Sequence, residues 1–164
     1  MREEQLRTIA LAWLQARYSL SKFALPLFKL HELHQTITEY LKSRLIGQDL
    51  TRIPLYDQLD LEPDIVGVVK LRRNNDYSLA WITAEVKVNE VNMTDFREAL
   101  FFAEKTHSYD AFLLYDGRVT KDVARLVKKG GHSFQGVTKW GNPSRKFLSL
   151  LRHQDGRFVR NTSL

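Results

Sequence analysis

Acidic and basic side chains stand at the ends of two neighbouring apolar segments, residues 63–71 and 77–88. Asp64 opens the first segment, and Glu85 and Lys87 lie late in the second. The polar run between the segments predicts a turn, so we expect the two to pair as neighbouring strands. Because strand side chains alternate between faces, Glu85 and Lys87 should point the same way. Pairing should also bring Asp64 beside Glu85.

Two carboxylates held a few ångströms apart repel each other unless a proton or a cation lies between them. Oxygen ligands of this kind suit Mg²⁺ or Mn²⁺, which take further oxygens from water and from a phosphate. A lysine beside such an ion would orient or deprotonate a water, or stabilise charge on the phosphate. These are the parts of a metal-dependent phosphodiester hydrolase. The alternative is a surface ion pair between Glu85 and Lys87, contributing less than about 1 kcal/mol.

The pattern Pro63-Asp64, then 20 residues, then Glu85-Val86-Lys87 resembles the PD-(D/E)xK nuclease superfamily, which includes many restriction endonucleases and archaeal Holliday-junction resolvases. The resemblance implies an α/β fold with a restriction-endonuclease-like core, in which helices flank a mixed central β-sheet. It also implies that Asp64, Glu85 and the Val86 carbonyl bind Mg²⁺ or Mn²⁺, and that Lys87 serves the attacking water.

The resemblance implies further polar residues around this site. Family members often carry a Glu on the helix before the first strand, for which Glu39 is the best-placed candidate and Glu32 the second. At about 100° per residue, however, Glu39 lies nearly opposite the leucine-rich stripe of its expected helix, so either that helix is contacted on two sides or the assignment is wrong. On the helix after the motif, Arg97 is the candidate fourth member, with a solvent-facing arginine as the alternative.

Apolar periodicity predicts the other elements in an order that agrees with the nuclease core. We expect helices over 3–18, 30–47, 94–107 and 120–129 and strands over 51–58, 110–116 and 132–140. The tail allows two interpretations. Asn142-Pro143-Ser144 would cap a helix, whereas Asp155-Gly156 would turn a hairpin.

The length of 164 residues predicts one domain. We expect it to comprise an N-terminal helical extension (1–29), a nuclease-like core (30–140) and a basic C-terminal extension (141–164). The sequence has no cysteine, which excludes disulfides and thiolate metal sites. No apolar run approaches the length needed to span a bilayer, and the N-terminus lacks a signal-peptide pattern. We therefore expect a cytoplasmic protein without a membrane partner.

The formal charge of +6 is unevenly distributed. Residues 118–164 hold 11 Lys and Arg against Asp122 and Asp155, a net of +9, whereas residues 1–117 hold 14 basic and 17 acidic residues. A basic third of the chain near an acidic site favours a polyanionic partner, here DNA, over a merely solvated face. The candidate DNA contacts are Arg97, Lys128, Lys129, Lys139, Arg145 and Lys146.

Together these features predict a metal-dependent DNA endonuclease that hydrolyses phosphodiester bonds. The alternative is a catalytically inactive DNA-binding subunit or regulator of a defence, repair or recombination complex. Nucleases that cut both strands often act as symmetric dimers, so we expect a homodimer as one assembly, with its contact on the N-terminal helix.

Overall fold

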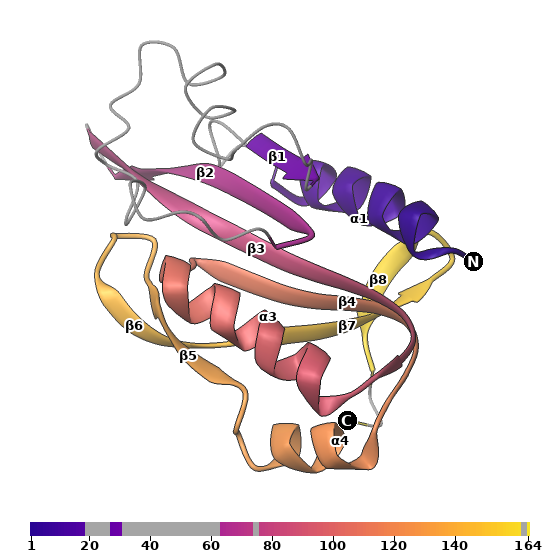
Figure 1. The fold of residues 1–164 in the computed structure, drawn as a ribbon. Coiled ribbons are helices and arrows are strands. Elements are labelled where there is room, and N and C mark those ends of the chain that lie inside the picture. The colour runs from indigo at the N-terminus through magenta and orange to yellow at the C-terminus, as the bar shows by residue number, and fades with distance from the viewer. Residues whose placement is uncertain (19–26, 31–62, 74–75, 162–163) are drawn as a thin grey trace.

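A six-stranded mixed sheet forms the centre of the computed structural model (Figure 1), which describes residues 1–18, 27–30, 63–73, 76–161 and 164. The strand order is β1-β2-β3-β4-β7-β8. The strands are β1 (Leu27–Leu30), β2 (Ile65–Arg73), β3 (Asp76–Val91), β4 (Asp110–Val119), β7 (Ser149–Gln154) and β8 (Arg157–Arg160). Neighbours pair antiparallel from β1 to β3, parallel from β3 to β7, and antiparallel between β7 and β8. The expected α/β class with a mixed sheet is therefore confirmed.

The predicted pairing of the two motif strands is also confirmed. β2 and β3 pair from Ile65 opposite Ala84 to Arg73 opposite Asp76. β3 then continues past the start of β2 to Val91, and its later part pairs with β4 in parallel. Glu85 and Lys87 thus lie just beyond the last residue of β3 that pairs with β2, where β3 is still paired with β4.

Helices cover both faces of the sheet because its strands are apolar on both sides. α1 (Glu3–Tyr18) packs on one face, against side chains such as Ala84, Val86 and Leu114. α3 (Met93–Thr106) packs on the other, against Ala111 and Leu113. α4 (Lys121–Lys128) joins the α3 side through Val123, and Figure 1 shows α1 and α3 on opposite sides of the sheet.

Helix caps adjust the expected boundaries. α3 begins at a capping box in which the Asn92 side chain accepts from the Asp95 N–H and the Asp95 carboxylate accepts from the Asn92 N–H, both at 3.0 Å. The N-cap is therefore Asn92, and the helix begins at Met93, one residue before the expected start at 94. Thr120 caps α4 in the expected place, accepting from the Val123 N–H.

The C-terminal part differs most from the expectation. β5 (Ser133–Val137) pairs with β6 (Pro143–Phe147) in a separate two-stranded sheet, so residues 132–140 do not add a strand to the central sheet. The tail forms the hairpin β7–β8 around Asp155 and Gly156, both with positive φ. Of the two interpretations of the tail, the hairpin is right and the helix is wrong.

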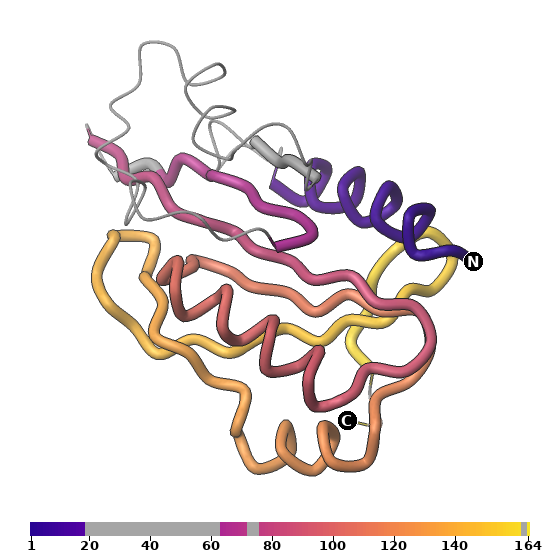
Figure 2. The backbone as a smooth tube through the Cα atoms, in the orientation of Figure 1, coloured from indigo at the N-terminus to yellow at the C-terminus, as the bar shows by residue number. Residues whose placement is uncertain are grey.

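Both segments expected as extensions contribute residues to the hydrophobic core. The apolar stripe of α1 is fully buried against the sheet through Leu6, Ala10 and Leu14. The β7–β8 hairpin lies beside α1 (Figure 2). The rings of Trp13 and Phe158 pack edge-to-face there, with their centroids 5.3 Å apart. Since the sheet already covers the apolar face of α1, that face is not free for the homodimer contact that we expected there.

Some expected elements lie outside the described residues. They are the strand over 51–58 and nearly all of the helix over 30–47, including Glu32 and Glu39. Leu30, which was expected to open that helix, instead ends β1. No helix in the described ranges is long and apolar enough to cross a membrane.

Candidate active site

Asp64 lies immediately before β2 and contacts the backbone and a side chain of β3. Its N–H donates to Glu85 Oε1 at 3.1 Å, and its Oδ2 accepts from the Val86 N–H at 2.8 Å. These contacts follow from the strand register, because Ile65 opposite Ala84 places Asp64 opposite Glu85. The expectation that Asp64 lies beside Glu85 is confirmed.

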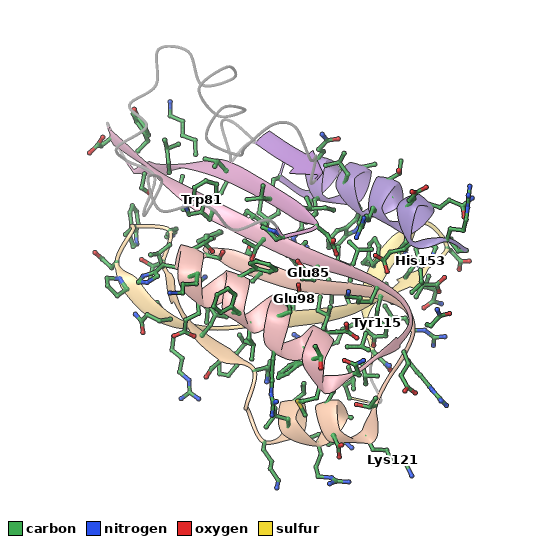
Figure 3. All side chains as sticks on the ribbon, in the orientation of Figure 1. Trp81, Glu85, Glu98, Tyr115, Lys121 and His153 are labelled. Atoms are coloured by element: carbon green, nitrogen blue, oxygen red, sulfur yellow. The ribbon has the colours of Figure 1, made fainter. Side chains whose placement is uncertain are left out.

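Glu85 is a buried acid, with 4% of its surface exposed. Burial raises the pKa of its carboxyl group to about 9, and the neighbouring Asp64 carboxylate and the nearby Glu98 of α3 (Figure 3) add to the rise. The hydrogen bond from the Asp64 N–H opposes the shift, because it favours the ionised form. At neutral pH, and without a metal ion, Glu85 therefore carries a proton.

Lys87 points to the same face of β3 as Glu85, as the two-residue spacing predicts. Its Nζ lies 3.5 Å from Oδ1 of Asp95 on α3. Burial lowers the pKa of Lys87, but Asp95, Asp64 and other carboxylates together outweigh it, so the net shift is upward. Lys87 is therefore a protonated cation at neutral pH, which suits a hydrogen-bond donor better than a base.

Two residues of α1 reach this site that the sequence reasoning missed. Nη2 of Arg7 lies 2.7 Å from Asp64 Oδ1 and 2.8 Å from Glu3 Oε1. The spacing of Glu3 and Arg7 signals a helical ion pair, but nothing local links that pair to an aspartate 57 residues away.

The helix after the motif also contributes acids that were not expected. Asp95 pairs with Lys87, and the charge of Glu98 acts on Glu85. Arg97, the expected fourth member, is exposed on the same helix. Its contact with DNA stays a prediction.

Acidic groups outnumber cations around the motif. Among the described residues, five carboxyl groups and two cations lie at or beside the motif, namely Glu3, Asp64, Glu85, Asp95 and Glu98 with Arg7 and Lys87. Within the part of the chain that the structure describes, however, no three His, Asp or Glu side chains are grouped tightly enough to hold a metal ion by themselves. Glu39, the expected additional acid, is not among the described residues.

The available donors nevertheless fit a hard divalent cation. Asp64 and Glu85 supply carboxylate oxygens, and the Val86 carbonyl lies on the same side of β3 as its N–H, which faces Asp64. Oxygen-only donors with surplus negative charge favour Mg²⁺ or Mn²⁺ over softer metals.

The expected DNA contacts lie on the surface, in elements other than the motif strands. Lys139 is in the turn between β5 and β6, with its Nζ 4.9 Å from the ring centroid of the exposed Trp140. The guanidinium carbon of Arg145 likewise lies 5.3 Å from the ring centroid of Phe147. The remaining candidates are at the end of α4 or on β6, namely the exposed Lys128 and Lys129 and the half-buried Lys146.

A comparison of the chain with models of protein families, with curated proteins and with solved structures finds no match.

Proposed function

We propose that the chain is a divalent-metal-dependent DNA endonuclease that acts through Asp64, Glu85 and Lys87. The observation that carries the proposal is the direct contact of Asp64, just before β2, with Glu85 of β3. Glu85 is buried, and the described acidic groups around it outnumber the described cations. A surface ion pair does not account for this arrangement, because a buried carboxyl group beside a second one costs stability.

The order of elements supports a restriction-endonuclease-like core. In the part of the chain that the structure describes, the order is a helix (α1), three antiparallel strands (β1 to β3), a helix (α3) and a strand parallel to the third (β4). The resemblance implies this order, with the Asp opening the second strand and Glu-x-Lys late in the third. In this interpretation α1 is the first helix of the core.

Each side chain has a defined task in the proposed reaction. Asp64, Glu85 and the Val86 carbonyl would hold Mg²⁺ or Mn²⁺, and Glu85 must give up its proton to do so. The bound ion would supply an activated water and neutralise charge on the scissile phosphate. Lys87, held in place by Asp95 and protonated, would donate hydrogen bonds to the water and to the phosphate oxygens.

DNA would bind through exposed cations of the C-terminal third of the chain. The turn between β5 and β6 places Lys139 and Trp140 near β3, since the Ser78 hydroxyl donates to the Lys139 carbonyl at 3.5 Å. A lysine over an exposed aromatic ring offers a charge for phosphates and a surface for unpaired bases. The sequence offers no recognition helix or zinc module for reading base edges, so we infer selection by DNA structure and not by a fixed sequence.

Cleavage of labelled DNA tests the proposal. Linear duplex, single-stranded and four-way-junction DNA are incubated with Mg²⁺ or Mn²⁺ and wild type, Asp64→Asn or Lys87→Ala. We expect metal-dependent cutting that Asp64→Asn abolishes and Lys87→Ala reduces by about 100-fold or more. The exposed control variants Asp122→Asn and Lys105→Ala should cut as wild type. Cutting that survives Asp64→Asn would contradict the assignment.

A second candidate function is that of a DNA-binding subunit with this fold that does not cut. The contact between Arg7 and Asp64 favours it, because a protein cation already neutralises the carboxylate that a metal ion would need. Tight, salt-sensitive binding by wild type without cleavage of any DNA form would identify this function instead.

A further inference from the structure

Arg7 occupies an unusual position beside the candidate metal ligands. Its side chain is about one-third exposed, and Nη2 of the guanidinium bridges Asp64 Oδ1 and Glu3 Oε1, at 2.7 and 2.8 Å. The helix holds Arg7 there firmly, because the adjacent Leu6 is fully buried against the sheet. Its Nε–H is buried and finds no acceptor in the described part of the chain.

We propose that Arg7 is an exchangeable counter-cation, which neutralises Asp64 in the metal-free protein and competes with the divalent ion for that carboxylate. The inference rests on the proposed function, since it concerns metal binding at the same site.

The contacts of Asp64 explain why the two cations compete. Its Oδ2 accepts from the Val86 N–H and its Oδ1 accepts from Arg7, so both oxygens are engaged by donors before a metal ion binds. A divalent ion on either oxygen would lie a few ångströms from the guanidinium, and like charges at that separation repel strongly in a partly buried site.

Two features of Arg7 make the exchange feasible. Glu3 lies one turn earlier on α1 and still pairs with the guanidinium after Asp64 is released. The Nε–H has no acceptor in the described part of the chain, so a shift of the guanidinium breaks no hydrogen bond at that atom. The metal-free and metal-bound sites would then differ mainly in which cation faces Asp64.

Titration with Mn²⁺ in the absence of DNA tests this inference without any activity measurement. The binding constant is measured from the free Mn²⁺ signal in electron paramagnetic resonance for wild type, Arg7→Gln and Arg7→Lys. We expect Arg7→Gln to bind Mn²⁺ at least about fivefold more tightly than wild type, because the competing charge is gone. Arg7→Lys keeps that charge and should stay within about twofold of wild type.

A matched control separates the local effect from a change in net charge. Arg118→Gln also removes one cation from an ion pair, with Glu90, but that pair is exposed. Its affinity for Mn²⁺ should equal that of wild type. Thermal unfolding in EDTA provides a second readout. Arg7→Gln should melt below wild type there, and saturating Mn²⁺ should raise its melting temperature by more. If Arg7→Gln does not fold, both measurements are repeated with Arg7→Met, which preserves the aliphatic packing of the side chain.

The outcomes distinguish the inference from the proposed function. Equal or weaker Mn²⁺ binding by Arg7→Gln and Arg7→Met would overturn the role of Arg7 and leave the metal site in place. Saturable Mn²⁺ binding by these variants but not by wild type would support the inference, because it would mean that Arg7 excludes the ion from the wild-type site. An absence of saturable binding in wild type and variants alike would overturn the metal site, and the proposed nuclease with it.

Discussion

Replacing Glu85 by Gln should stabilise the metal-free protein at neutral and alkaline pH. The substitution keeps the shape of the protonated side chain and its acceptor for the Asp64 N–H, but it removes the buried group that must ionise as pH rises. The wild-type carboxyl group has a pKa of about 9 in the folded chain against an ordinary value of 4.5. Folding therefore favours the protonated form.

The sign and size of the effect follow from this difference. An acid with a raised folded-state pKa contributes its full stability below the unfolded-state pKa and loses it as pH rises towards the folded-state pKa. Between pH 6 and pH 8 the unfolded chain ionises Glu85 and the folded chain does not. The wild type should lose about 1.4 kcal/mol of unfolding free energy per pH unit from this group, or roughly 3 kcal/mol over that interval. The loss should level off above about pH 9.

Urea unfolding in EDTA at pH 6, 7 and 8 measures this slope. The difference between wild type and Glu85→Gln isolates the contribution of Glu85 from that of the other titratable groups. Glu104→Gln serves as the control, because Glu104 is an exposed glutamate on α3 and its substitution should leave the pH profile parallel to that of wild type. Parallel profiles for wild type and Glu85→Gln would refute the reasoning, since they would mean that Glu85 is already ionised at neutral pH.

Two further predictions concern the frame that holds the site. Gly117→Ala should cost more than about 3 kcal/mol in urea unfolding, because φ is 152° and a Cβ would lie 1.7 Å from the Asn89 carbonyl oxygen. Gly130→Ala, with φ of 76° and no atom within 4 Å, should cost only about 1–2 kcal/mol, and equal losses would contradict the steric argument. Tyr18→Phe should cost about 1–3 kcal/mol by the same measurement, because it removes the hydrogen bond that the Tyr18 hydroxyl donates to the Asp110 carboxylate. A loss of unfolding free energy below about 0.5 kcal/mol would mean that this hydrogen bond does not stabilise the fold.

The positions of Asp64, Glu85 and Lys87 were predictable because they depend only on the pairing of two strands that are neighbours in the chain. β2 ends at Arg73 and β3 begins opposite it at Asp76, and this short separation in the chain sets the register that brings Asp64 beside Glu85. The two-residue period of a strand then places Lys87 on the same face as Glu85. These rules need no knowledge of the rest of the molecule.

The surroundings of the motif were not predictable, because they depend on how the helices dock. On α3, Asp95 and Glu98 lie on one flank of the buried stripe formed by Phe96 and Ala99, and Arg97 lies on the other. Periodicity identifies that stripe but does not say which flank faces the motif. The choice of Arg97 as the fourth member had no support from periodicity for this reason.

The sequence by itself determined the paired strands, the placement of Asp64 beside Glu85, and the helices with their buried stripes, since each depends on short-range periodicity and turn chemistry. Only the tertiary structure decided that Arg7 faces Asp64 and that β7 pairs with β4. Both contacts join segments far apart in the chain. Burial of apolar surface and charge compensation over the whole fold decide which segments make these contacts. Neither effect produces a periodic pattern in the local sequence.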